Sequence, residues 1–400
     1  MVNIWLFRRF VLAKTIESAK VITPIKVINN GTVVVGDDGK IAYVGPKNLA
    51  PETAGERLNL GKLTILPGLI DIHVHGGSGI TFGNLETLQQ DLHTYSNWVV
   101  PYGVTGFLTT VTGPNPESLT AIIRSLSGEF EAGLPGAQGL GIHLEGPFMN
   151  IAKKGAQNPD WIRNPGLEEA EMYLDAGGKW IRQITIAPEL PGAQAVAKLF
   201  RDGDVSVAIG HSDADYETAR AALESYWNHV THTFNAQSGL HHRRPGVVGA
   251  VLASDEVTAE LIADTVHVHP GAMKVLFRCL GSDRIVLVTD AMEAAGLPDG
   301  MYHLLGAKVI VKDGKATQED GTIASSTALL NQCVRNMNEF VGVTLSDAVK
   351  MATLNPALVI GEAHKRGSLE AGKYADLIAV DNNLDIYLTM VNGEIVYSKV

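Results

Sequence analysis

The sequence predicts an α/β protein: a (β/α)8 TIM barrel with a small β-sandwich domain built from the N- and C-terminal segments. Three observations lead to this prediction. Between residues 67 and 364, eight apolar, β-rich runs alternate with helical stretches, as in a parallel barrel of βα units. Residues 1–66 and 365–400 contain short strands and tight turns. Candidate metal-binding and catalytic residues stand at the ends of five of these runs, which is where such barrels carry their chemistry.

The eight runs are expected to form the barrel strands. Each is rich in apolar and β-branched residues and precedes a stretch long enough for a helix. A doubly wound open sheet is the structural alternative, but no Gly-x-Gly-x-x-Gly turn opens its first crossover. The runs are Leu69–His75, Val104–Thr109, Gly139–Glu145, Ile181–Ala187, Val205–Gly210, His229–Thr233, Thr258–Ile262 and Ile285–Asp290.

The two ends of the chain show the pattern of β-hairpins. Near the N-terminus, Thr32–Val35 and Lys40–Val44 flank an Asp-Asp-Gly turn. Near the C-terminus, Ile386–Val391 and Glu394–Tyr397 flank an Asn-Gly turn, a strong hairpin signal. We expect the two ends to pair into one small domain.

Composition excludes several functional classes. The chain has 400 residues and a formal net charge of −11, which disfavours non-specific binding to nucleic acid. No apolar stretch is long enough to predict a membrane span, and Arg8 and Arg9 interrupt the apolar N-terminus. Only Cys279 and Cys333 are present, and we expect both to be buried thiols in a reducing, cytoplasmic compartment.

The end of the first run carries the first metal-ligand candidates. Asp71, His73 and His75 alternate with apolar residues, so the three side chains are expected to share one face of the strand. His73 and His75 could then bind one cation. A His-x-His pair alone is a weak signal, but this pair directly precedes two glycines at the end of an apolar strand.

Three further runs end in residues that could hold a metal. Glu145 closes a buried apolar run, where an unpaired carboxylate would be costly. A structural salt bridge is the simpler alternative for it. His211 and His232 close the fifth and sixth runs. Imidazole and carboxylate ligands together suit zinc or ferrous iron better than calcium or magnesium.

Asp290 closes the eighth run and is the candidate catalytic group. Five apolar or β-branched residues lead into this single acid. A carboxylate at the barrel mouth can take a proton from an activated water and pass it to a leaving amine. Metal-assisted hydrolysis is therefore the chemistry that these strand ends predict.

Sequence blocks along nearly the whole chain carry a family resemblance. They are Pro67–Gly76, His143–Phe148, Gly210–Ser212, Phe234–Ala236, Leu240–Arg243, Ile262–Asp264, His267–Pro270, Thr289–Ala291 and Gly372–Leu377. On these residues the chain resembles the amidohydrolase superfamily and, within it, the N-acetylglucosamine-6-phosphate deacetylase family. The blocks that contain Glu145, Asn235-Ala236 and His241-His242-Arg243 are specific to that branch.

The resemblance implies metal-dependent hydrolysis of N-acetyl-D-glucosamine 6-phosphate to D-glucosamine 6-phosphate and acetate, a step of amino sugar catabolism. It implies one or two zinc or iron ions per subunit. The primary ion would lie on Glu145 together with the histidines of the fifth and sixth runs, and a second could lie on His73 and His75. Asp290 would be the catalytic acid and base.

The resemblance also implies a set of substrate contacts. Asn235, the backbone of Ala236 and Arg243 would hold the sugar phosphate, with the arginine reaching in from a neighbouring subunit of a homodimer. His267 would contact the sugar, and Gln157 would lie near the acetyl carbonyl. The remaining candidate substrate-binding residues are Ala156, Ile323, Ala324 and Ser325.

Three positions depart from the family pattern and leave alternatives open. Thr265 and Ser325 stand where relatives usually carry glycine, and Gln237 replaces a common methionine. A deacetylase for N-acetylgalactosamine 6-phosphate or for another N-acyl amino sugar phosphate is therefore a second candidate. Cyclic-amide hydrolases are a weaker one, because many use a carboxylated lysine where this chain has Glu145. A non-catalytic scaffold would not need the ligand set and Asp290 together.

Overall fold

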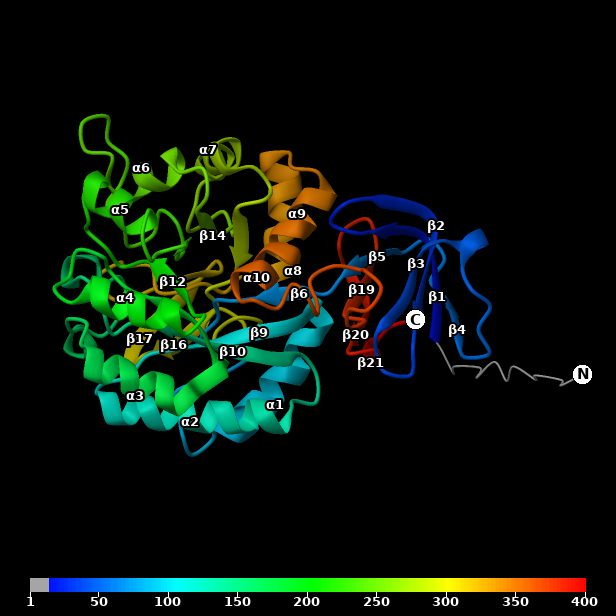
Figure 1. Cartoon of the computed structure of the whole chain (residues 1–400), viewed down its shortest axis with the longest axis horizontal. Helices are drawn as coiled ribbons and strands as arrows, with labels where there is room; N and C mark the ends of the chain where they lie inside the picture. The colour runs from blue at the N-terminus through cyan, green and yellow to red at the C-terminus, as the bar shows by residue number, and fades with distance from the viewer. Residues whose placement is uncertain (1–13) are drawn as a thin grey trace, which may run out of the picture.

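The computed structural model describes residues 14–400. Figure 1 shows a barrel surrounded by helices beside a smaller β domain, and the C-terminus lies in that smaller domain. The first thirteen residues, which we expected to belong to the small domain, lie outside the described residues.

Eight parallel strands form the barrel, so the predicted fold class is confirmed. Their order in the sheet is β15-β14-β13-β12-β11-β10-β9-β6. Each predicted run overlaps one of them; several strands end earlier than predicted, whereas β9 extends past Thr109 and β10 begins one residue before Gly139. The strands are β6 (Leu69–Asp71), β9 (Val104–Val111), β10 (Gln138–Glu145), β11 (Ile181–Thr185), β12 (Ser206–Ile209), β13 (His229–Val230), β14 (Thr258–Ile262) and β15 (Ile285–Val288).

Backbone hydrogen bonds just beyond the first and last strands bring the two ends of this sheet together. The Asp290 amide donates to the carbonyl of His73 at 2.8 Å, and the His75 amide donates to the carbonyl of Ala291 at 2.8 Å. The chain after β6 thus lies directly beside the chain after β15. The residues that we expect to do the chemistry are part of this closure.

Helices cover the outside of the barrel. Their starts follow ordinary capping chemistry: Asn115 accepts from the Ser118 amide at the start of α2, with Pro116 in its first turn. The helices are α1 (Leu88–Val99), α2 (Pro116–Ala132), α3 (Leu167–Gly177), α4 (Ala193–Asp202), α5 (Tyr216–Leu223), α6 (Gly246–Ala253), α7 (Pro270–Leu280), α8 (Leu330–Asn336), α9 (Leu345–Met351) and α10 (Leu354–Val359). Their apolar faces and the outward-facing strand residues form one large buried cluster.

The small domain is a mostly antiparallel sheet made from both ends of the chain. β19 from the C-terminal segment pairs with β5 from the N-terminal segment. β1 pairs with β4 along its first half and with β5 along its second, so the strands form one branched sheet around its own apolar cluster. The strands are β1 (Lys14–Ile22), β2 (Val27–Val35), β3 (Ile41–Pro46), β4 (Arg57–Asn59), β5 (Thr64–Pro67), β19 (Leu377–Val380), β20 (Ile386–Val391) and β21 (Glu394–Ser398).

Two small sheets at the barrel mouth were not predicted. One is the antiparallel sheet of β16 (Gly300–Leu304), β17 (Ala307–Lys312) and β18 (Lys315–Thr317), and the other pairs β7 (Gly76–Gly77) with β8 (Ile80–Thr81). The expectation of two buried thiols is wrong for Cys279, which is exposed near the end of α7, while Cys333 is buried. Among residues 14–400, no helix combines the length and apolar character needed to cross a membrane.

Candidate metal centre and catalytic pocket

The candidate ligands meet at the carboxyl ends of the barrel strands. Glu145 is the last residue of β10, whereas His211, His232 and Asp290 stand just beyond β12, β13 and β15. These last three residues have positive φ angles of 46°, 27° and 49°. This left-handed backbone ends the strands early, and such strain is common at functional sites.

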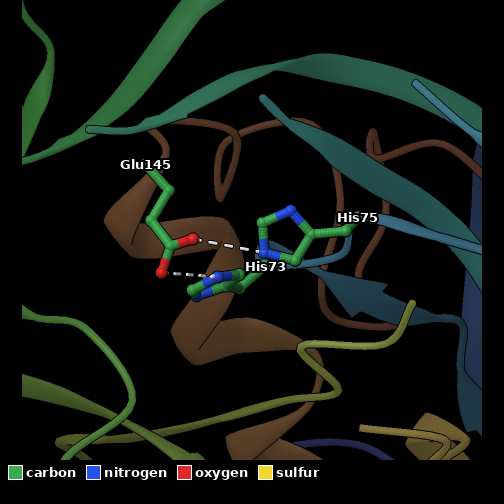
Figure 2. Close-up of side chains that lie close together, drawn as sticks. All are labelled: His73, His75 and Glu145. Carbon is green, nitrogen blue, oxygen red and sulfur yellow. Dashed lines mark ion pairs between the residues drawn. The ribbon is translucent and has the colours of Figure 1, made fainter. Parts of the chain in front are cut away.

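Four imidazoles surround the Glu145 carboxylate. Its oxygens lie 3.0 Å from Nε2 of His232, 3.2 Å from Nε2 of His211, 3.2 Å from Nε2 of His75 and 3.4 Å from Nε2 of His73. Figure 2 shows His73 and His75 on one side of this carboxylate. All five side chains are buried, so the structure brings together residues that are far apart in the chain.

The chemistry of this group fits a bound cation. His211 directs Nδ1 at the carbonyl of Lys153, and His73 directs Nδ1 at the carboxylate of Glu260. Both partners only accept hydrogen bonds, so each Nδ1 carries a proton and Nε2 is the ring nitrogen that faces Glu145. Nε2 of His73 has no hydrogen-bond partner, although it is buried. Imidazole nitrogens and carboxylate oxygens that converge in a buried place are groups that could hold a metal ion between them.

The donors divide into two sets that share one carboxylate. His73, His75 and Glu145 form one set, and Glu145, His211 and His232 form the other, with the ligand atoms of each set within 4.8 Å of one another. The site is therefore a buried group of histidines and a glutamate that can bind metal. Its composition is that of zinc and iron sites rather than calcium or magnesium sites.

The charges of the site shift the pKa values of its own groups. Burial would raise the pKa of Glu145, but the surrounding histidines, His73 foremost, hold it well below its ordinary value. Burial would lower the pKa of His75, but hydrogen bonds to Asp290 and Glu145 raise it to about 9. Asp290 likewise keeps a lowered pKa because His73 and His75 offset the effect of its burial. The two carboxylates are thus ionised at neutral pH.

Asp290 stands beside the donor set that contains His73 and His75. Its carboxylate lies 3.2 Å from Nε2 of His75 and 3.6 Å from Nε2 of His73. The hydroxyl of Ser325 donates to it at 3.3 Å. A carboxylate that is ionised, nearly buried and open to the pocket can accept a proton from a water held at the same place.

A cavity of about 300 Å³ opens over the metal centre. Most of the predicted substrate residues line it: Ala156, Gln157, Asn235, Ala236, His267, Ile323 and Ser325. Gln157 also donates to Glu145 at 2.8 Å. The β16–β18 sheet adds Leu304 and Leu305 to the wall.

Two predicted substrate residues lie elsewhere. Ala324 is fully buried in the apolar cluster beneath the β16–β18 sheet, and its amide donates to the carbonyl of Ala316, so it does not line the cavity. Arg243 is exposed in the loop before α6, beside His242 at 2.7 Å, and does not line the cavity of its own chain. Within the described part of the chain, residues 14–400, no lysine or arginine lines this cavity.

The expectation that Asp71 shares a face with the two histidines is wrong. The chain bends at Ile72 and His73, so the alternation of the strand does not continue through them. Asp71 instead accepts a 2.6 Å hydrogen bond from the hydroxyl of Thr289, the residue before Asp290. Burial raises the pKa of Asp71 to about 7, although this hydrogen bond opposes the change.

Glu260, which lies in the barrel interior on β14, was not predicted from the sequence. Its carboxylate is fully buried and receives four contacts, from Gln183, His229, the Nδ1 of His73 and the backbone amide of His232. The available signal was an acid in the middle of the apolar run Thr258–Ile262. A buried carboxylate needs partners of this kind.

The three departures from the family pattern have different structural settings. Thr265 and Ser325 occupy positions with φ of 69° and 52°, where glycine would be unstrained. Gln237 is buried and donates to the carbonyl of Thr231 at 2.6 Å, so it fixes the loop that carries Asn235 and Ala236. Of the three, only Ser325 lines the cavity.

Comparisons with known proteins agree with this geometry. The model of the amidohydrolase family matches residues 64–396. The N-acetylglucosamine-6-phosphate deacetylase of Vibrio furnissii is 37% identical over 369 residues, covering 92% of this chain and 91% of that protein. The N-acetylgalactosamine-6-phosphate deacetylase of Escherichia coli O157:H7 is 37% identical over 359 residues, covering 90% of this chain and 93% of that protein.

A solved structure is similar over the whole fold. The N-acetyl-D-glucosamine-6-phosphate deacetylase of Mycobacterium smegmatis, a mutant in complex with N-acetyl-D-glucosamine-6-phosphate, superposes with a TM-score of 0.89 at 32% identity. The match covers 96% of this chain and 100% of that one.

Proposed function

This chain belongs to the amidohydrolase family, and we propose that it hydrolyses N-acetyl-D-glucosamine 6-phosphate to D-glucosamine 6-phosphate and acetate. One observation carries the proposal: two sets of buried metal-ligand atoms share Glu145 directly beside Asp290. The relatives from Vibrio furnissii and Bacillus subtilis, which are similar over more than nine tenths of the chain, bear the name of this activity.

We propose one or two divalent transition metal ions, zinc or iron, as the cofactor. Glu145, His211 and His232 would hold the first ion, and His73 and His75 would hold the second with Glu145 shared between them. When bound, such a metal supplies a Lewis acid that polarises the amide carbonyl and lowers the pKa of a water.

Asp290 would move the proton. Its lowered pKa keeps it ionised at neutral pH, so it can take a proton from the attacking water. It then delivers that proton to the amide nitrogen, which leaves as the amine when the C–N bond breaks. Gln157, held against Glu145 at 2.8 Å, lies where it could donate a hydrogen bond to the acyl carbonyl.

The phosphate would bind at Asn235 and the backbone of Ala236, at the side of the cavity that follows β13. A phosphate also needs positive charge, and the lining supplies no lysine or arginine. We propose that Arg243 of a second subunit supplies it in a homodimer, because guanidinium matches phosphate oxygens well. This loop is exposed on its own subunit and is therefore free to reach a partner.

The galacto epimer is a second candidate substrate. The observation that favours it is the equal identity, 37%, to relatives named for the gluco and the galacto activity. Ser325, a departure from the family pattern, lines the cavity beside Asp290 and could bear on this choice. The reaction chemistry would be the same for both sugars.

We also propose that the enzyme works in the cytoplasm, on a small sugar phosphate and without nucleic acid or membrane partners. The exposed thiol of Cys279 suits a reducing compartment. The formal net charge of −11 disfavours nucleic acid.

The experiment that tests the function is an assay of acetate release from a panel of N-acetylated sugars, with the metal content measured on the same sample. The panel contains N-acetylglucosamine 6-phosphate, its galacto epimer and both unphosphorylated sugars. Fast release from the gluco sugar phosphate supports the proposal. Preference for the galacto epimer would show that N-acetylgalactosamine 6-phosphate is the substrate instead. If protein loaded with zinc or iron releases no acetate from any of these sugars, deacetylation is excluded.

A further inference from the structure

A second cavity adjoins the catalytic pocket on the side of His75. Its volume is about 370 Å³, and it shares His75, Leu304 and Leu305 with the pocket over the metal centre. The two spaces are therefore neighbours separated by a metal-ligand candidate and by the tip of the β16–β17 hairpin. We name it the acyl-side cavity; its other walls include Phe82, Gly83, Val111, Thr112, Ile122 and Trp161.

The walls of the acyl-side cavity combine a well-supported apolar part with polar residues, including Thr81, Asn84, Thr110, Thr112 and His303. Phe82, Val111 and Ile122 have at most 5% of their surface exposed and belong to the large core cluster outside the barrel. Among residues 14–400, no lysine or arginine lines the cavity, and Glu293 is the one acid that does. A preformed apolar space of this kind favours an apolar group over a charged one.

The position of the acyl-side cavity fixes which part of a substrate would enter it. Val111 closes β9, the second strand of the barrel in chain order, and Asn235 follows β13, the sixth. In an eight-stranded barrel, these two strands lie on opposite sides of the mouth. A substrate with its phosphate at Asn235 and its amide carbonyl at Glu145 directs its acyl group away from the sugar. That direction leads past His75.

We infer that the acyl-side cavity admits acyl groups longer than acetyl, such as propionyl and butyryl, on the same amino sugar phosphate. The inference rests on the proposed function and extends its substrate class. The reaction is unchanged: water adds to the acyl carbon, the C–N bond breaks, and a short-chain carboxylate and the free amine are released. No co-reactant other than water is required.

Gly83 offers a way to fill the cavity without disturbing its walls. A Cβ at Gly83 meets no atom within 4 Å, and no positive φ restricts the residue. A leucine at this position can therefore occupy the cavity. Gly128 on α2 is a matched control, because a Cβ there also meets nothing and the residue is exposed far from the site.

The test compares kcat/KM for the N-acetyl, N-propionyl and N-butyryl forms of glucosamine 6-phosphate by release of the amine. We expect the butyryl form to be hydrolysed within about tenfold of the acetyl form, since added methylenes gain apolar contacts. We expect Gly83→Leu to lower the ratio of butyryl to acetyl kcat/KM by about tenfold or more, and Gly128→Leu to leave the ratio unchanged. Val111→Phe, which fills the cavity from β9, should act in the same direction as Gly83→Leu.

The outcomes separate this inference from the proposed function. Turnover of the acetyl form with butyryl turnover more than about a hundredfold slower would overturn the inference alone. An unchanged ratio in both filling variants, with metal content and melting temperature as in the wild type, would also overturn it. No turnover of any of the three substrates by the metal-loaded enzyme would overturn the proposed function itself.

Discussion

The carboxylate of Glu260 lies 2.8 Å from Nδ1 of His73, and both side chains are fully buried. The same carboxylate oxygen accepts the backbone amide of His232 at 3.0 Å, while the other oxygen faces Gln183 at 2.7 Å and His229 at 3.3 Å. One acid thus holds a histidine of one donor set and the backbone of the other. Such outer partners fix the tautomer and the orientation of metal ligands.

Glu260→Gln should weaken metal binding at the His73 and His75 position. The glutamine side chain has one acceptor oxygen where the carboxylate has two. Nδ1 of His73 and the backbone amide of His232 would therefore compete for that oxygen with Gln183 and His229. We expect a 10- to 100-fold loss of metal affinity, about the usual effect of losing such a partner. Metal analysis after dialysis against a weak chelator would detect it.

The control for Glu260 is Glu256→Gln, an exposed glutamate four residues earlier on the chain. It should bind metal as the wild type does. If Glu260→Gln retains the full wild-type metal content under the same dialysis, Glu260 does not orient a ligand, and its contacts serve the barrel interior alone.

Asp290→Asn should abolish turnover without emptying the site. The asparagine can keep the contact with Ser325, but it cannot take a proton, so we expect kcat to fall by about 10²- to 10⁴-fold. Metal content should not change, because neither donor set includes Asp290. Steady-state kinetics and metal analysis on one preparation test this. A kcat near that of the wild type would remove Asp290 from proton transfer.

The sequence was sufficient to predict the barrel and the convergence of the candidate ligands, because both depend on strand ends. Apolar runs locate parallel strands, and a polar residue at the end of each run must point into the barrel mouth. Glu145, His211, His232 and Asp290 therefore converge as their positions predicted. The pairing of the two chain ends was also predictable, since the turns of the hairpins are local signals.

Other features depend on tertiary structure that no local pattern encodes. The bend at Ile72 and His73 separates Asp71 from the histidines, although the sequence alternates regularly. The role of Glu260 depends on hydrogen-bond partners from three other strand segments, which only the folded structure brings together. The β16–β18 sheet interrupts the alternation of strands and helices, so a prediction based on that alternation did not include it.

The pH dependence of substrate affinity should follow His267. Burial would lower its pKa, but Asp264, whose carboxylate lies 2.7 Å from Nδ1, raises it above the ordinary value; Asp290 also raises it and Lys315 lowers it. The imidazole of His267 thus stays protonated to higher pH. It supplies positive charge for the sugar phosphate to a pocket that, among the described residues, no lysine or arginine lines. KM for the sugar phosphate should rise as the pH increases through this raised pKa.

Asp264→Asn should move that rise in KM to lower pH, because burial then acts on His267 without its anionic partner. The ion pair between His267 and Asp264 also stabilises the folded protein. This stabilisation is complete below the ordinary histidine pKa and is lost as the pH rises through the raised pKa of His267 in the folded state. Profiles of kcat and KM between about pH 6 and pH 9 would show it, with exposed Asp255→Asn as the control. An unmoved KM profile would contradict the role of His267.

Arg366 should be needed for stability at the base of the small domain. Its guanidinium lies 2.8 Å from Asp376 and 3.6 Å from Glu362, and all three side chains are at most 7% exposed. Arg366→Met leaves two buried acids without this partner, so we expect a loss of about 3–5 kcal/mol in the free energy of unfolding. Exposed Arg220→Met should change it by no more than about 0.5 kcal/mol.

The loss at Arg366 should depend on pH. Burial already raises the pKa of Asp376 despite the arginine. A buried carboxyl group with a raised pKa makes the folded protein less stable as the pH increases, because the group must then ionise. The variant should therefore be closer to the wild type in acid than at neutral pH. Urea denaturation at both values tests this, and equal destabilisation at both would show that the arginine acts by packing.

Arg243 should act on the active site of the other subunit, which mixed dimers can test. Arg243→Ala and Asp290→Asn should each be nearly inactive alone on the sugar phosphate. In a heterodimer purified through two different tags, the Arg243→Ala subunit retains Asp290 and receives an intact arginine from its partner. One of the two sites is then complete, so we expect about half of the wild-type rate for a two-fold symmetric dimer. If the arginine served its own subunit, each site would lack one group and the heterodimer would stay inactive. If the protein sediments as a monomer at assay concentrations, Arg243 cannot act on the site of another subunit. The phosphate would then need a cation from its own subunit. Lys154, in the loop beside Gln157, is the nearest candidate along the chain.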